Sequence, residues 1–133
     1  MELAMLSSSA RANRIGTAIG LIPVLFLLFD SVIKVLQVAP VTESFTQLGY
    51  PTRLALAIGL LELGCLVLYV IPRTAVFGAI LLTGYLGGAI ATHVRVGSPL
   101  ATHVLFPVYV ALLLWGGLIL RESALRTLVP FRR

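Results

Sequence analysis

The sequence predicts an all-α polytopic membrane protein, an antiparallel bundle of four transmembrane helices formed by a single domain, residues 1–133. Hydrophobic residues make up 59 % of the chain and charged residues 11 %, whereas soluble domains have roughly 45–50 % and about 25 %. The apolar residues fall into four runs, each close to the ~20 residues that cross ~30 Å of hydrocarbon. A soluble fold of 133 residues cannot bury so much apolar surface. We therefore expect the surplus to face lipid.

The first predicted span covers residues 15–36. Its core, residues 15–29, carries no charge, and Asp30 and Lys34 enter its last two turns. Pro23 lies inside the run and is tolerated, because neighbouring groups in a membrane bundle can satisfy the freed carbonyl. A polar connection over residues 37–50 follows.

The second and third predicted spans, residues 52–71 and 75–92, form a hairpin around a very tight connection. In this connection Pro72 stops one helix and Thr74 can cap the next. The second span holds a single charge, Glu62, close to its middle. Tyr69 near its end is typical of an interfacial aromatic belt.

A short loop over residues 93–102 leads to the fourth span, residues 103–120, and to a basic tail, residues 121–133. In the tail, apolar residues alternate with arginines. This pattern predicts an interfacial segment held by anionic headgroups.

The basic residues predict the orientation of the spans. The net charge is +5, but the arginines lie mostly at the ends of apolar runs and are not interleaved with aromatic residues, so we expect a lipid bilayer and no nucleic acid as partner. By the positive-inside rule both termini should be cytoplasmic. The two predicted sides carry seven and three cations: Arg11, Arg14, Arg73, Arg121, Arg126, Arg132 and Arg133 against Lys34, Arg53 and Arg95.

Ionisable residues inside the spans cost ~2.5–3.5 kcal/mol each on insertion scales and therefore need a partner, a cavity or a function. They converge on the outer half of the bundle. Glu62 lies about ten residues from the outer end of its span, near the midplane at ~1.5 Å per residue. We expect an outward-opening pocket between the first three spans, floored by Glu62, with the fourth span mainly a wall. The candidate ligand-binding residues are Asp30, Lys34, Glu62, Tyr85, His93, Arg95 and His103.

Several of these residues have alternative interpretations. Asp30 and Lys34 are four residues apart and can form a structural ion pair. Glu62 can be a buried partner of Lys34 or Arg95, a proton carrier, or a catalytic acid or base assisted by His93. His93 and His103 with Glu62 would make a two-histidine, one-carboxylate site. Their spacing matches no metal motif, so no metal is predicted.

Small residues in the third span favour close helix packing. Gly84, Gly88 and Ala91 follow small-xxx-small spacing, which lets the backbones of two membrane helices approach each other. The same face offers a surface for a homo-oligomer.

The sequence resembles the DoxX-like family of small four-helix membrane proteins over about residues 14–130. The order and spacing of several segments together make the resemblance specific. One departure is Val32, where the family typically has a glycine. This difference is expected to alter the contact between helices at this position. The segments are Phe29-Asp30-Ser31-Val32-Ile33-Lys34, Leu48-Gly49-Tyr50-Pro51, Gly59-Leu60-Leu61-Glu62-Leu63, Ile71-Pro72-Arg73, Gly78-Ala79-Ile80-Leu81-Leu82-Thr83, Gly84-Tyr85-Leu86-Gly87-Gly88-Ala89 and Leu120-Arg121.

The resemblance implies a bundle in the bacterial inner membrane. The family is named after a subunit associated with thiosulfate–quinone oxidoreduction, and related members are linked to redox complexes or to membrane-protein assembly. Cys65 is the single cysteine, a CxxC pair is absent, and no flavin, haem or iron–sulfur motif is recognisable. The resemblance therefore implies a quinone held by Glu62, Lys34 or His93, and a redox-partner protein that supplies the electron transfer.

Three hypotheses about function remain open at this point. The first is an accessory subunit that binds a quinone or another hydrophobic small molecule. The second is a stand-alone isomerase or hydrolase that uses Glu62 as acid or base with His93 assisting. The third is an assembly or scaffold protein that binds other membrane proteins through small-residue faces. A proton carrier has thinner support, because no polar path continues to the cytoplasmic side.

Overall fold

The computed structural model describes residues 1–128, which form helices joined by short turns. Four of the helices are long and apolar, which confirms an all-α polytopic membrane protein. Transmembrane length is reached by α1, by α4 and by the stretch Leu100–Arg121, which includes α5, whereas α3, with 17 residues, is shorter. The elements are α1 (Glu2–Val35), α2 (Ala39–Gln47), α3 (Leu54–Val70), α4 (Ala75–Arg95), a short π-helical segment η1 (Leu100–Val104), α5 (Phe106–Arg121) and α6 (Ser123–Leu128).

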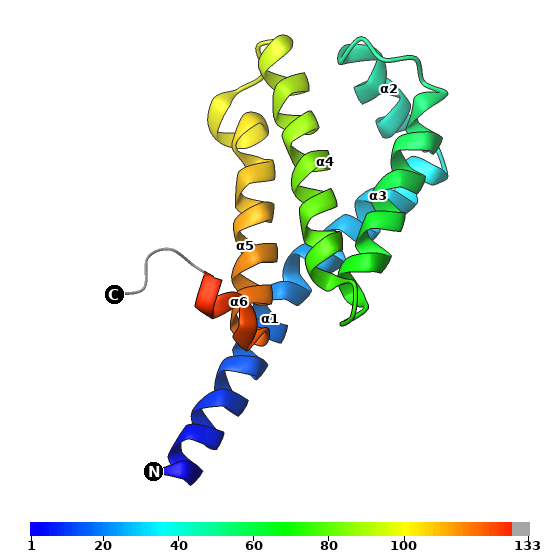
Figure 1. The fold of residues 1–133 in the computed structure, drawn as a ribbon. Coiled ribbons are helices and arrows are strands. Elements are labelled where there is room, and N and C mark those ends of the chain that lie inside the picture. Colours follow the sequence, from blue (N-terminus) through cyan, green and yellow to red (C-terminus); the bar gives the residue numbers. More distant parts are fainter. Residues whose placement is uncertain (129–133) are drawn as a thin grey trace.

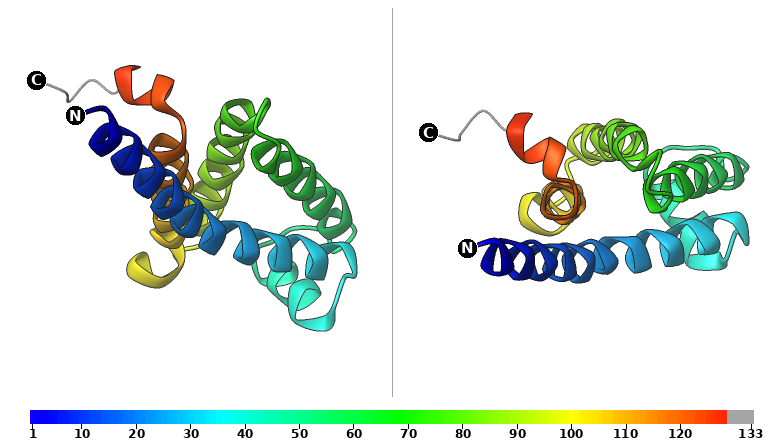
Figure 2. Two further views of the ribbon diagram at one scale, coloured as in Figure 1. Left: turned by 90° about the horizontal axis from the view of Figure 1, so that it is seen from below. Right: turned by 60° about the horizontal axis from the view of Figure 1, so that its bottom comes forward.

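The long helices form a ring in which α1 runs diagonally. Figure 2 shows α1 along one side of the bundle, with its N-terminal part extending past α5. α1 packs against α5 and α3, and α4 also packs against both of these helices. α1 and α4 therefore lie diagonally opposite each other in the ring. One end of the bundle holds α2 and the α4–α5 connection, and the other holds the α3–α4 turn and α6 (Figure 1).

The crossing of α1 and α5 depends on three glycines. A Cβ atom at Gly117 would lie 2.8 Å from the Gly16 carbonyl oxygen and from the Gly20 Cα. Such small residues, spaced four apart in α1, allow close backbone approach. The spacing of Gly84 and Gly88 predicted close helix packing at these two residues, and within the chain that prediction is wrong. A Cβ atom at either of them would meet no atom within 4 Å.

The α3–α4 hairpin is equally tight. A Cβ atom at Gly78 would lie 2.3 Å from the Tyr69 backbone nitrogen. Thr74 occupies the position before α4, but its hydroxyl donates to the Leu68 carbonyl at 2.8 Å and does not cap the helix. Pro72 and Arg73 form the turn between the helices, as predicted.

Tyr69 is buried and not part of an interfacial belt. Only 1 % of its surface is exposed. Its hydroxyl donates to the Leu114 carbonyl at 2.7 Å and accepts from the Arg121 guanidinium at 3.2 Å. Tyr69 thus joins α3 to α5 at the α6 end of the bundle. The prediction that Tyr69 lies at the membrane interface was wrong. In a membrane helix, the neighbours in the sequence are apolar whether a residue is buried in the bundle or faces lipid, so they do not distinguish the two.

Several helix boundaries differ from the predicted spans. α1 begins at Glu2 and not near residue 15, and its 34 residues extend about 51 Å at 1.5 Å per residue. The predicted polar connection contains α2, whose Val41 and Phe45 are buried one turn apart. At the other end, Arg126 donates to the Ile119 and Leu120 carbonyls. The remainder of the predicted tail, residues 129–133 with Arg132 and Arg133, lies outside the described residues.

Candidate functional site

A cavity of about 510 Å³ lies in the half of the bundle that holds α2 and the α4–α5 connection. Its walls come mainly from α4 and α1; the start of α5 adds three residues, and α2, α3 and η1 add two each, those of α3 being Ile58 and Leu61. The start of α5, in the fourth predicted span, forms an apolar part of the wall. Phe106, Pro107 and Val110 line the cavity directly. Most of the lining is apolar or aromatic, and the charged side chains gather on one wall.

Lys34 is the centre of this charged wall. Its ammonium donates to Asp30 one turn earlier, to Glu62 Oε2 at 2.8 Å and to the Tyr85 hydroxyl at 2.7 Å. The Tyr85 hydroxyl donates in turn to Glu62 Oε2 at 2.9 Å. We call these four residues the Lys34 cluster. The cluster joins α1, α3 and α4, and it connects the diagonally opposite α1 and α4 across the ring.

A close approach of α3 to α1 brings Glu62 to Lys34. A Cβ atom at Gly59 would lie 2.7 Å from the Lys34 Cβ and 3.0 Å from the Ser31 carbonyl. Glu62 follows one helical turn after Gly59 and therefore faces the same side. Ser31 is fully buried at this contact. Val32, the departure from the family pattern, lies away from it and is 40 % exposed.

Gly84 and Gly88 make room for the cavity. They flank Tyr85 on α4 and line the cavity, with no atom within 4 Å of an added Cβ. Side chains at these positions would project into the cavity. The two glycines therefore set the width of the cavity, whereas Gly87 between them is exposed and does not line it.

The charges of the Lys34 cluster do not cancel. Two carboxylates, Asp30 and Glu62, share one ammonium. Glu62 is fully buried and is not part of the cavity wall, which at this level consists of Asp30, Lys34 and Tyr85. Within residues 1–128, Glu62 Oε1 has no hydrogen-bond partner. In an apolar interior such charges are stable only when they are paired.

Two histidines lie at the mouth of the cavity. The rings of His93 and His103 are 5.5 Å apart, edge to face, and both residues line the cavity. Their Nδ1 atoms lie 3.0 Å from the Ser98 hydroxyl and 2.8 Å from the Thr102 hydroxyl. Glu62 is bound to Lys34 instead, and no group of three or more metal-ligating side chains occurs among the described residues.

Two predicted site residues do not line the cavity: Glu62, which was expected at its floor and is buried behind Lys34 and Tyr85, and Arg95. The Arg95 guanidinium donates to the Leu48 carbonyl and lies over the Tyr50 ring, 5.8 Å from the centroid. Tyr50 is in turn 3.0 Å from the Thr92 hydroxyl. Arg95 therefore holds the segment between α2 and α3 against α4, and it does not line the cavity.

The sequence analysis missed the contributions of α2 and of the aromatic residues. Ser44 and Phe45 of α2 line the cavity. Phe26 of α1 and Phe106 of α5 pack edge to face at 5.0 Å on another part of its wall. The apolar pair Val41 and Phe45, four residues apart after Pro40, was the available signal for a short amphipathic helix.

Fold and site together define a small polytopic helical membrane protein whose bundle encloses an apolar cavity with one charged wall. A family model described as the DoxX-like family matches residues 18–117, and the chain belongs to this family. The match includes every residue of the Lys34 cluster. No curated protein and no solved structure was found to match the chain.

Replacing Tyr85 with phenylalanine is expected to destabilise the bundle by ~1–3 kcal/mol, because a Lys34 N–H and Glu62 each lose a partner in a buried network. The measurement is the thermal unfolding of the purified protein in detergent. Tyr109→Phe is the matched control, since its hydroxyl is exposed and makes one long contact of 3.4 Å. Equal unfolding temperatures of the two variants would contradict the structural role given to the Tyr85 hydroxyl.

Proposed function

We propose that this protein is a ligand-binding accessory subunit of a membrane redox system, and that its cavity holds a quinone or a similar lipid-like molecule. The observation that carries the proposal is the apolar cavity of about 510 Å³ with the Lys34 cluster on one wall. Small-molecule sites typically measure ~300–1,000 Å³ and are apolar with a few polar groups that orient the ligand. The redox assignment rests on the family membership.

The lining suits an aromatic head group on an apolar chain. Phe26, Tyr85 and Phe106 offer aromatic surfaces, and offset or edge-to-face contacts with such rings add to the gain from burial. Charged side chains occupy one place only, the charged wall, and the other polar lining side chains are neutral: Ser44, Tyr50, Thr92, His93, Thr102 and His103. A molecule with one polar ring and a hydrocarbon chain fits this lining, because the ring can bind the polar side chains and the chain can pack against the apolar ones.

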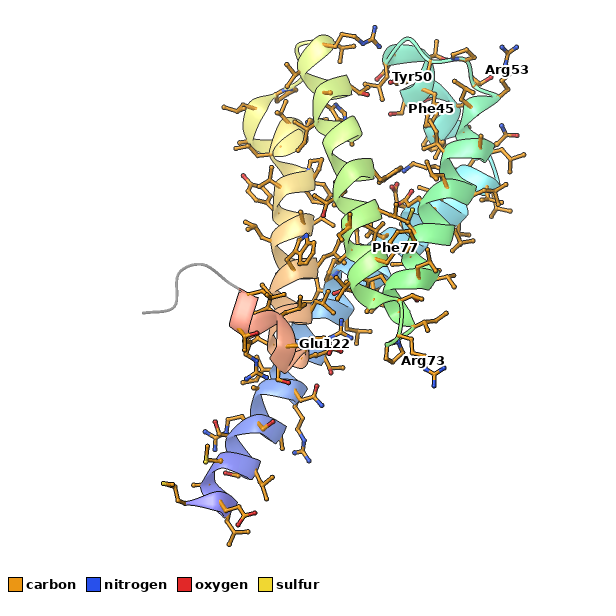
Figure 3. All side chains as sticks on the ribbon, in the orientation of Figure 1. Phe45, Tyr50, Arg53, Arg73, Phe77 and Glu122 are labelled. Carbon is orange, nitrogen blue, oxygen red and sulfur yellow. The ribbon has the colours of Figure 1, made fainter. Side chains whose placement is uncertain are left out.

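We place the protein in the bacterial inner membrane with both termini in the cytoplasm, so that the cavity lies in the outer half of the bilayer. The support is the asymmetry of the cations. Figure 3 shows Arg73 at the end of the bundle near α6 and Arg53 at the opposite end. Arg11, Arg14, Arg121 and Arg126 belong to segments at or beyond the Arg73 end, and the positive-inside rule assigns the Arg-rich end to the cytoplasm.

The other two hypotheses have less support. A catalytic acid or base must reach its substrate, but Glu62 is fully buried behind Lys34 and Tyr85. Gly84 and Gly88 are exposed, but both line the cavity, so a partner helix that packs on them in a scaffold or homo-oligomer would have to enter it.

The variant Gly88→Leu tests the proposal. The Cβ atom of a leucine at position 88 would meet no atom within 4 Å, and this position lines the cavity. The steric cost of this leucine to a bound ligand, ~1–3 kcal/mol, should lower occupancy about tenfold or more. Gly87→Leu is the matched control, because position 87 belongs to the same helix, is open, and does not line the cavity.

Occupancy is measured by mass spectrometry of lipid-soluble molecules that copurify in mild detergent. The expected result is a quinone or lipid-like molecule bound to the wild type and to Gly87→Leu, and lost from Gly88→Leu. The proposal fails if the wild type carries no such molecule, or if both leucine variants retain it equally.

A further inference from the structure

We infer that the ligand in this cavity donates a hydrogen bond to Asp30, so that within the quinone class the cavity selects the reduced hydroquinone over the oxidised quinone. This inference rests on the proposed function and adds the redox state of the bound molecule. It follows from the donors and acceptors that the Lys34 cluster leaves available to the cavity.

The donors of the charged wall are all in use. An ammonium has three N–H groups and a tyrosine one O–H group. Lys34 donates to Asp30, Glu62 and Tyr85, and Tyr85 donates to Glu62. Neither side chain has a further hydrogen to offer a ligand without breaking one of these bonds.

An acceptor remains available on the same wall. Asp30 accepts from Lys34 through Oδ2, and its side chain is 28 % exposed. Asp30 lines the main cavity and also a smaller adjoining one of about 230 Å³. The Asp30 Oδ1 atom has no hydrogen-bond donor among the described residues. The second unpaired carboxylate oxygen, Glu62 Oε1, is fully buried and out of reach of a ligand.

An acceptor wall distinguishes the two redox states of one molecule. An oxidised quinone presents two carbonyl oxygens, which only accept hydrogen bonds, whereas a hydroquinone presents two O–H groups. A hydroxyl that donates to a carboxylate makes a short, strong, charge-assisted bond. A carbonyl in the same place would set two acceptors against each other where little water can intervene.

The histidines at the mouth do not reverse this preference. His93 follows Tyr85 by eight residues on α4, about 12 Å at 1.5 Å per residue. A neutral imidazole donates or accepts at Nε2 according to its tautomer. The histidine pair can therefore serve either redox state of a ligand, as can the Ser44 hydroxyl beside Asp30, which also donates or accepts. The discrimination falls to Asp30.

Three ligands with the same ring and chain test the inference: a hydroquinone, its quinone and its dimethyl ether, which keeps the shape and has no donor. Binding to the wild type in nanodiscs is measured by anaerobic thermophoresis with a chemical reductant in the hydroquinone samples. We expect the hydroquinone to bind about tenfold tighter than the quinone or the ether, the gain typical of one charge-assisted hydrogen bond.

In Asp30→Asn the hydroquinone and the quinone should bind with affinities within about twofold of each other, because an amide both donates and accepts. Thr46→Ala, an exposed change on α2 that does not line the cavity, should keep the wild-type ratio. The comparison of the three ligands on the wild type stands even if Asp30→Asn fails to fold. Equal affinity for hydroquinone and quinone, or for hydroquinone and ether, overturns the inference and leaves the proposed function intact. Binding of none of the three overturns both.

Discussion

Replacing Lys34 with methionine is expected to destabilise the protein by ~3–5 kcal/mol, the cost of removing one partner of a buried ion pair. Glu62 is fully buried, and Lys34 is its cationic partner. Without the ammonium, Glu62 and Asp30 would remain as two carboxylates in an apolar interior. The bond to Tyr85 that connects α1 to α4 would also be lost. Methionine keeps the length and the apolar stem of the side chain. The loss of stability therefore reports the removal of the ammonium charge and not a loss of packing.

The measurement is the fraction of monodisperse protein that remains after heating in detergent. Arg53→Met is the matched control, since it also removes one cation but at an exposed position. The triple change Lys34→Met, Glu62→Gln and Asp30→Asn should recover part of the loss, because it leaves no unpaired charge. A Lys34→Met protein as stable as Arg53→Met would show that the cluster does not hold the helices together.

Two adjacent glycines in α5 are expected to respond to the same change in opposite directions. Gly117→Ala places a Cβ atom 2.8 Å from the Gly16 carbonyl oxygen and from the Gly20 backbone. Backbone cannot rotate away as a side chain can, so α1 and α5 must separate. We expect a loss of ~1–3 kcal/mol or more, as for other overpacked sites.

Gly116→Ala adds the same methyl group where no atom lies within 4 Å. Alanine is preferred over glycine inside a helix by roughly 0.5–1 kcal/mol. We therefore expect this variant to be as stable as the wild type or more so. Thermal unfolding of both variants in one detergent gives the comparison. Similar losses at positions 116 and 117 would contradict the close crossing of α1 and α5.

The sequence determined the class of protein and where the apolar runs lie along the chain. Apolar runs of this length, separated by polar turns, form transmembrane helices, because a helix makes all the backbone hydrogen bonds of a segment within that segment. The pairing of Asp30 with Lys34 was also predictable, since residues four apart in a helix are neighbours. The cost of a charge in an apolar helix marked Glu62 as a residue that needs a partner.

Other features depended on contacts between helices. Lys34, and not Arg95, pairs with Glu62, because Gly59 brings α3 against α1 at this level. Gly84 and Gly88 have the spacing of a packing motif, yet they line a cavity, while Gly16, Gly20 and Gly117 make the close crossing. The length of α1 and the presence of α2 were missed, because both segments contain polar residues outside the apolar runs.

The sequence did not predict these contacts because the solvent of this protein is the lipid bilayer. In a soluble helix the polar and apolar faces differ, so the sequence indicates which face is buried. In a membrane helix the lipid-facing side is as apolar as the side that faces the bundle, and the sequence carries little information about rotation. The sequence alone therefore determined that four helices cross the membrane and which charges they carry. Only the tertiary structure decided which faces meet, and hence that Asp30, Lys34 and Tyr85 form the charged wall of one cavity with Glu62 behind them.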